Sequence, residues 1–273
     1  MTSLAVRAQA PVRLDGNCVA RFRRQVIARG VPMSRSSVGE WNLCPARWAF
    51  QTVERQARGP VSDELRLGRA CHLVVATLLV ARPAGDPQTY VALALSGQRV
   101  PDHLLPSAVD WVLWADALVR QRGGSVDLVE QSIRTGISGI QLSGRLDLVI
   151  SGGSAAPLEL VDWTFGRNPR FAGVETMALD LGTSIYRTLL AVAMPERPEH
   201  VLVSDVHVPG RQVLSVELDR DEVHRAWREI QEVRDGMRAV AETGVVEANP
   251  GRHCEWCPFQ RRCPQVQLQE VTA

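Results

Sequence analysis

The chain has 273 residues, of which 45% are hydrophobic and 22% charged, a composition that suits one large globular domain or two small ones. Its formal net charge of +1 excludes a strong overall basic field, so any binding of nucleic acid must use a local surface. The 31 residues counted as lysine or arginine are all arginine, which excludes any mechanism that needs a lysine side chain.

The N-terminal residues 1–30 carry scattered arginines and lack the apolar run of a signal peptide. The longest apolar stretch, residues 73–81, is far shorter than a membrane span. These features predict a cytoplasmic protein that does not cross a membrane. In a reducing compartment the six cysteines are poor candidates for disulfides, and clustered cysteines indicate metal binding.

Local patterns predict helices at both ends of the chain and strands between them. We expect residues 1–33 to form a weakly ordered arm or a short additional element. Ser37 and Glu40 have the spacing of a capping box, which predicts a helix that carries Cys44. Pro45 suits the first turn of a second short helix.

The rest of the chain alternates between helical and strand periodicity. The pattern predicts, in chain order, a helix over 63–80, a loop over 82–102, a helix around 111–118, strands over 125–133, 140–151 and 158–164, a helix over 175–192, strands over 201–208 and 213–218, a helix over 219–243 and a loop over 249–264. This order predicts a single α/β or α+β domain with a central mixed sheet flanked by helices.

Three cysteines, Cys254, Cys257 and Cys263, lie within ten residues near the C-terminal end. Thiolates at this spacing can hold one face of a metal centre. The candidates for a fourth ligand are Cys44 at a predicted helix junction, His253, Cys18 in the arm and Cys71 in an apolar helix, where a free thiol is usually core packing. Spacing does not distinguish zinc from an iron–sulfur cluster, because both accept four thiolates.

Acidic residues recur along the predicted strands. Glu130 ends a β-rich run, Asp147 lies in Gly-Arg-Leu-Asp, and Asp162 lies in Val-Asp-Trp-Thr. His72 lies upstream in Gly-Arg-Ala-Cys-His. Any one of them alone is explained as an exposed acid or a core histidine, but acids that lie together repel unless they hold cations. Hydrolysis of a phosphodiester needs such ligands, since Mg²⁺ or Mn²⁺ lowers the pKa of water and neutralises phosphate charge.

With these motifs in this order, the chain resembles the PD-(D/E)XK nuclease superfamily. It is most similar to the RecB-like group, which includes CRISPR-associated exonucleases with a four-cysteine [4Fe–4S] cluster. The resemblance covers roughly residues 34–266 and rests on Ser34, Ser36, Cys44, Pro45, Gly68, His72, Glu130, residues 144–147 and 161–166, Cys254, Cys257, Cys263 and Pro264.

The resemblance implies a restriction-endonuclease-like core over residues 34–267, preceded by the arm 1–33 and followed by a tail over 268–273. It implies two inorganic sites, a Mg²⁺ or Mn²⁺ site on His72, Glu130, Asp147 and Asp162, and a structural [4Fe–4S] cluster on Cys44, Cys254, Cys257 and Cys263. The implied function is a metal-dependent DNA exonuclease that acts on single-stranded ends in DNA repair, recombination, or CRISPR or phage DNA processing. A protein partner in a repair or CRISPR complex is a further expectation.

Two positions depart from the family pattern. The catalytic lysine falls on Thr164, and the glutamine four residues before Tyr186 falls on Gly182. Loss of one preorganised electrostatic donor typically costs about 10²–10³-fold in rate. We predict that Arg167, just past the end of the strand, substitutes as the cation and acts with the four metal ligands in catalysis.

Arg145 and Arg170 are the other arginines that could substitute for the lysine. We expect an active deoxyribonuclease. The first alternative is a catalytically impaired nuclease-fold module that binds DNA or a protein partner. The second is a regulatory protein whose chain ends are joined by a zinc ion, and in which the strand acids have no catalytic role.

Overall fold

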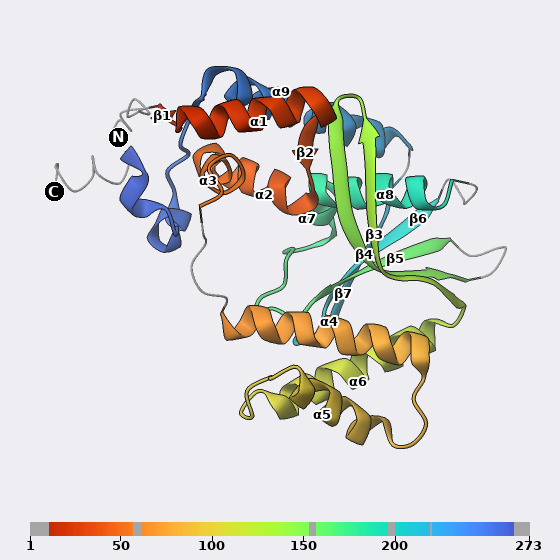
Figure 1. The fold of residues 1–273 in the computed structure, drawn as a ribbon. Helices are drawn as coiled ribbons and strands as arrows, with labels where there is room; N and C mark the ends of the chain where they lie inside the picture. Colours follow the sequence, from red (N-terminus) through yellow and green to blue (C-terminus); the bar gives the residue numbers. More distant parts are fainter. Residues whose placement is uncertain (1–10, 57–61, 153–156, 196–199, 219, 265–273) are drawn as a thin grey trace, which may run out of the picture. The chain divides into compact units, whose positions relative to one another are not determined.

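The fold is given by a computed structural model, which describes residues 11–56, 62–152, 157–195, 200–218 and 220–264 (Figure 1). Its main sheet has the order β2-β4-β5-β6-β7, with β3 paired to β4. The strands are β2 (Val31–Met33), β3 (Ser125–Ile137), β4 (Ile140–Ser151), β5 (Leu158–Thr164), β6 (Val201–His207) and β7 (Gln212–Leu218). The pairs β2–β4 and β5–β6 are parallel, whereas β4–β5 and β6–β7 are antiparallel. The predicted α/β class with a central mixed sheet is confirmed.

The chain divides into two compact units. The first unit contains the described residues up to 56, residues 135–142, and the described residues from 227 onward. The second unit contains the described residues between 62 and 134 and between 143 and 226. The strands β3 and β4 and the helix α9 (Arg220–Thr243) each contribute residues to both units.

The first unit brings the two ends of the described chain together. β1 (Val12–Arg13) pairs antiparallel with β8 (Val245–Val246). Helix α1 (Gly16–Arg29) begins after Asp15, whose side chain accepts a hydrogen bond from the backbone N–H of Cys18. The described part of residues 1–33 forms a helix with a strand on either side.

Aromatic side chains fill the centre of the first unit. The Trp48 ring packs edge-on against Phe22 and Trp41, with centroids 5.8 and 5.0 Å apart. A Cβ atom on Gly236 of α9 would lie 2.5 Å from the Trp41 ring, so a glycine is required for this approach. The unit also contains α3 (Pro45–Thr52) and the 3₁₀ turns η1 (Arg252–Trp256) and η2 (Gln260–Arg262).

Helix α2 (Arg35–Leu43) begins earlier than the sequence predicts. Ser34 is its N-cap, and it exchanges reciprocal side-chain-to-backbone hydrogen bonds with Ser37. The predicted capping box on Ser37 and Glu40 is therefore wrong. A serine at the third helical position makes the same return bond as a glutamate, and Glu40 instead pairs with Arg47 at 2.6 Å.

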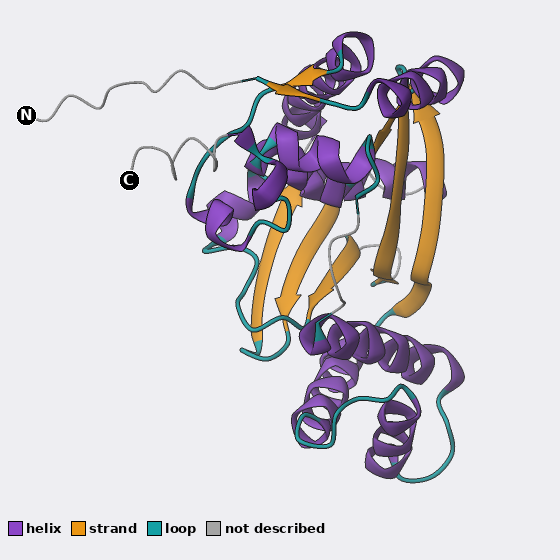
Figure 2. Cartoon of the chain, turned by 60° about the vertical axis from the view of Figure 1, so that its left-hand side comes forward, coloured by secondary structure: helices purple, strands orange, loops and turns teal. Residues whose placement is uncertain are grey.

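The second unit carries a helical layer of α4 (Asp63–Ala81), α5 (Pro87–Gly97) and α6 (Leu105–Arg122). Figure 2 shows these three helices as one group beside the strands of this unit. Their apolar faces share a core with side chains of β4, β5 and β6, which include Leu148, Val161 and Val206. This burial supplies most of the stabilising free energy that an amphipathic helix contributes.

The loop that we predicted over residues 82–102 is wrong, because α5 lies within it. Asp86 caps this helix by accepting from the backbone N–H of Thr89 at 2.9 Å, and Pro87 occupies the first turn. Proline is favoured at this position, where its missing N–H would be unpaired anyway. Val91 and Leu95 are fully buried and fix α5 to the core.

The helices α7 (Val174–Ala178) and α8 (Leu181–Ala193) complete the second unit. A Cβ atom on Gly144 of β4 would lie 2.5 Å from Leu189 Cδ1, which explains the glycine of the Gly-Arg-Leu-Asp motif as a point where α8 approaches the strand closely. Among the described residues, no helix combines the length and the apolar character needed to cross a membrane.

Candidate functional site

The candidate site in the second unit lies where β4 and β5 separate. The antiparallel ladder pairs Leu148 with Val161 and ends there. Asp147 and Asp162 are the next residues on the two strands. Beyond the ladder the backbone N–H of Trp163 has no strand partner in β4, and it donates to Asp147 Oδ2 at 2.9 Å. The fork therefore places Asp147 and Asp162 just beyond the end of the ladder and holds the carboxylate of Asp147 in a defined orientation.

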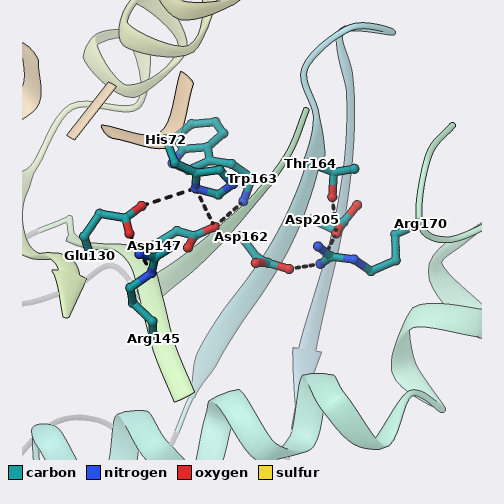
Figure 3. Close-up of polar contacts among 9 residues, drawn as sticks. All are labelled: His72, Glu130, Arg145, Asp147, Asp162, Trp163, Thr164, Arg170 and Asp205. Carbon is teal, nitrogen blue, oxygen red and sulfur yellow. Dashed lines mark hydrogen bonds and ion pairs between the residues drawn. The ribbon is translucent and has the colours of Figure 1, made fainter. Parts of the chain in front are cut away.

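Helix α4 and strand β3 add two further ligand atoms to this fork (Figure 3). His72 Nδ1 lies 3.2 Å from Glu130 Oε1 and 3.5 Å from Asp147 Oδ2. The ligand atoms of these three residues all lie within 4.8 Å of one another. One imidazole nitrogen and two carboxylate oxygens at this spacing fit a divalent cation, whose bonds to such ligands are about 2.0–2.6 Å long.

Glu130 has an unusual backbone. Its φ of 49° lies in the left-handed region, although it is not glycine and lies inside β3. Such a residue costs about 1–2 kcal/mol and interrupts the regular alternation of side chains along a strand. Its Oε2 atom pairs with Arg145 Nε at 2.7 Å, while Oε1 faces His72. A local strain is therefore kept at the residue that aims a carboxylate into the site.

The electrostatics of Asp147 are those of a group that favours a cation. Burial raises the pKa of the Asp147 carboxyl, and the neighbouring Glu130 adds to that shift. The charge of His72 and the N–H of Trp163 act in the opposite direction. The raised pKa means that ionising Asp147 costs free energy in the folded protein, which a bound cation would offset.

Asp162 lies in a second group of charges. The Arg170 guanidinium contacts the carboxylates of both Asp162 and Asp205 through Nη1, and its distance to Asp205 Oδ2 is 2.8 Å. Figure 3 shows Asp162 extending toward Arg170. Among the described residues, the trio of His72, Glu130 and Asp147 does not extend to Asp162. Its predicted role as a metal ligand stays a prediction.

The sequence analysis missed Asp205. It is the register partner of Asp162 on the parallel strand β6, and it is 3% exposed. Thr164, which stands at the position of the family's lysine, has its Oγ1 3.5 Å from Asp205 Oδ2. An acid inside the apolar run of β6 was the available signal. Arg167 is exposed in the segment after β5, and Arg170, three residues later, is the arginine that contacts Asp162.

The four cysteines that we predicted as cluster ligands line one cavity in the first unit. Cys44 stands between α2 and α3, Cys254 lies in η1, Cys257 follows η1, and Cys263 follows η2. The cavity has an empty volume of about 370 Å³, including open solvent, and is also lined by His253. Burial raises the pKa of the Cys257 thiol, and the nearby sulfurs of Cys44 and Cys254 raise it further.

Backbone N–H groups point at these sulfurs. Asn249 N donates to Cys44 Sγ at 3.4 Å, and Gly251 N donates to Cys254 Sγ at 3.5 Å. The cysteine-rich segment over residues 249–264 is also held by Arg262, whose Nη2 lies 2.7 Å from Glu54 Oε1. Donors of this kind stabilise negative charge on sulfur, so the donor set suits thiolates bound to metal.

The other two cysteines lie elsewhere. Cys71 is fully buried in the core of the second unit, and burial raises its pKa to about 12. The interpretation of Cys71 as core packing is confirmed. Cys18 lies in α1, where its sulfur accepts from Arg21 Nη2 at 3.5 Å, and it does not line the cavity.

Comparison with known proteins identifies the family. The family model described as "PD-(D/E)XK nuclease superfamily" matches residues 32–264. A search of curated proteins found no match. The chain is similar to the crystal structure of SSO0001, with 13% identity, a TM-score of 0.37, and coverage of 92% of this chain and 95% of that one.

It is also similar to a structure described as a "Putative exonuclease" from Eubacterium rectale, with 9% identity, a TM-score of 0.48, and coverage of 87% and 90%. Both scores lie below 0.5, so the assignment rests on the family model, which spans most of the chain. The chain belongs to the PD-(D/E)XK nuclease superfamily.

Proposed function

We propose that this protein is a metal-dependent DNA exonuclease of the RecB-like group, with its nuclease domain over residues 34–267. The observation that carries the proposal is the clustering of His72 Nδ1, Glu130 Oε1 and Asp147 Oδ2 at the fork of β4 and β5. These residues would hold Mg²⁺ or Mn²⁺. Buried acids that lie together without enough cations destabilise a fold, so their retention favours a metal-binding role.

A divalent ion at this position would activate a water molecule and neutralise charge on the scissile phosphate. The protein's own part is orientation. The Trp163 N–H fixes one oxygen of Asp147, and Arg145 holds the outer oxygen of Glu130. In the reaction the water oxygen bonds to phosphorus, one P–O ester bond breaks, and the departing oxygen takes up a proton.

Single-stranded DNA ends are the proposed substrate, in repair, recombination, or the processing of CRISPR or phage DNA. The support is the resemblance of the ordered motifs to exonucleases of this kind. A partner protein in such a complex is part of the same proposal. A cytoplasmic location would accord with these roles.

We propose that Cys44, Cys254, Cys257 and Cys263 hold a structural [4Fe–4S] cluster. The support is the resemblance of the four-cysteine motif to that of exonucleases with such a cluster, together with the cavity that these cysteines line. The cluster would join chain segments about 200 residues apart in sequence.

The test is cleavage of end-labelled single-stranded DNA by anaerobically purified protein in Mg²⁺ or Mn²⁺. Shortening of the labelled strand that disappears in Asp147→Ala and with a chelator supports the proposal. An Asp110→Ala variant is the matched control, because Asp110 is an exposed acid paired with Arg211 outside the site. Cleavage that persists in a folded Asp147→Ala variant at the wild-type rate would contradict the proposed site.

A second candidate function is a nuclease-fold module that binds DNA or a protein partner without cutting. The observation that favours it is the pairing of Arg170 with Asp162, one of the predicted metal ligands, in a site without lysine. Retained DNA binding with no cleavage in either metal would support this second function.

A further inference from the structure

Two buried carboxylates in the second unit share one guanidinium. Asp162 and Asp205 are register partners on adjacent parallel strands, and they are 5% and 3% exposed. Like charges in this arrangement repel strongly, because little water separates them. The Nη1 group of Arg170 contacts both carboxylates, and this contact offsets the repulsion.

The trio of His72, Glu130 and Asp147 and the pair of Asp162 and Asp205 are joined through β5, because Asp162 adjoins Trp163, whose N–H donates to Asp147 Oδ2. A divalent ion would lie on the trio, whereas the guanidinium of Arg170 already lies on the pair.

We propose that Arg170 is a built-in second cation, held in position by Asp205, and that the site therefore takes one divalent ion. This inference rests on the proposed metal site and deepens it. Arg170 lies after β5, its guanidinium is held by Asp162 and Asp205, and its side chain as a whole is one third exposed. Guanidinium binds phosphate well and stays charged at any pH, which suits a group that faces a DNA backbone.

Removal of Arg170 has a distinctive consequence under this proposal. Asp162 and Asp205 would remain as two adjacent buried carboxylates without their guanidinium, and a second divalent ion would then bind between them. Removal of the exposed Arg167 deletes the same charge three residues away and leaves that pair intact. The number of bound ions therefore distinguishes the two arginines.

The experiment counts Mn²⁺ ions by electron paramagnetic resonance of free Mn²⁺, with the metal alone as the probe. The expected counts are one ion for the wild type, one for Arg167→Ala, two for Arg170→Ala and one for the double variant Arg170→Ala/Asp205→Asn. Two ions in the wild type, or one in a folded Arg170→Ala variant, would overturn the proposal. Asp147→Ala should lose the ion that the wild type binds.

The double variant guards against misfolding. It keeps the net charge of −1 that Arg170, Asp162 and Asp205 carry together in the wild type. Its single-turnover cleavage of single-stranded DNA should fall by about 10²–10³-fold. Cleavage at the wild-type rate, or a loss that follows Arg167→Ala instead, would overturn the role of Arg170. Metal counting needs no turnover, so a wild type that binds one ion and never cuts would refute the proposed exonuclease and leave this inference standing.

Discussion

Asp147 accepts a hydrogen bond from the backbone N–H of Trp163, with 2.9 Å between Oδ2 and N. This bond spans the fork of β4 and β5. The backbone N–H that the open ladder leaves without a strand partner in β4 therefore orients a candidate ligand. The neighbouring His72 comes from a helix, and Glu130 comes from a strained position in another strand. The site thus combines three elements of the second unit around one carboxylate.

Asp147→Asn should stabilise the metal-free protein at neutral pH. Burial raises the pKa of the Asp147 carboxyl above its ordinary value of 3.8. The protonated carboxyl therefore contributes fully to the stability of the folded protein below pH 3.8, and this contribution is lost as the pH rises through the raised pKa. Asparagine retains an acceptor for Trp163 and carries no charge. In chelator at pH 7, thermal unfolding should shift upward by about 2–4 °C, the shift expected for about 1 kcal/mol in a chain of this size.

The difference between Asp147→Asn and the wild type should shrink as the pH falls toward 4, because the raised pKa of Asp147 favours protonation of its carboxyl as the pH falls. Mn²⁺ should raise the melting temperature of the wild type and leave that of the variant unchanged. A variant that is less stable than the wild type at pH 7 in chelator would contradict this account of the site's electrostatics.

Glu130→Gly should be more stable than Glu130→Ala. Both changes remove the carboxylate, and both should abolish tight Mn²⁺ binding. They differ in the backbone, because the φ of 49° is costly for alanine and free for glycine. Denaturant unfolding without metal should give a difference of about 1 kcal/mol in favour of glycine, whereas at an ordinary strand position alanine would be the more stable.

Cys71 should resist alkylation in the folded protein. Burial raises its pKa to about 12, so at pH 8 the reactive thiolate is nearly absent and the reagent has no access. Native protein treated with iodoacetamide should carry no label at Cys71 by mass spectrometry, and full labelling should follow unfolding. Labelling of native Cys71 as fast as of the partly exposed Cys18 would show that its core is open.

The same shift predicts a loss of stability in strong alkali. A thiol whose pKa is raised contributes stability that is full below its ordinary value of about 9 and is lost as the pH rises toward 12. Cys71→Ala should remove this part of the alkaline destabilisation, measured as the slope of melting temperature against pH between 9 and 11. An unchanged slope would assign that destabilisation to other groups.

Cys44→Ala should release the iron and destabilise the first unit. The proposed cluster would close a loop of about 200 residues, for which a cross-link contributes on the order of 5 kcal/mol in a chain-entropy description. Anaerobic wild type should be brown and contain about four iron atoms per chain, and Cys18→Ala should match it. Colourless protein with one zinc ion would instead support the alternative in which zinc joins the chain ends.

The sequence predicted the strands from β3 to β7, but it did not predict β2, which lies in the expected arm, and it predicted the helical details less well. Strand periodicity located β4, β5 and β6 to within a residue, because side chains that alternate or are buried on both faces leave a clear pattern. Helix α5 was missed, since Pro and Gly near residues 82–87 are typical of loops, although a proline can also begin a helix.

For the site, the ordered motifs identified His72, Glu130 and Asp147, which the fold brings together. They did not reveal Asp205, because its pairing with Asp162 depends on the register of two strands that are 40 residues apart. They favoured Arg167 over Arg170 by proximity along the chain. The path of the segment after β5 determines which arginine contacts Asp162, and periodicity carries no information about it.

The most direct test of the account is Mn²⁺-dependent shortening of single-stranded DNA by the wild type beside Asp147→Ala and Asp110→Ala. The account predicts cleavage by the wild type and by Asp110→Ala, and none by Asp147→Ala. A folded, metal-loaded wild type that leaves the DNA intact would contradict it.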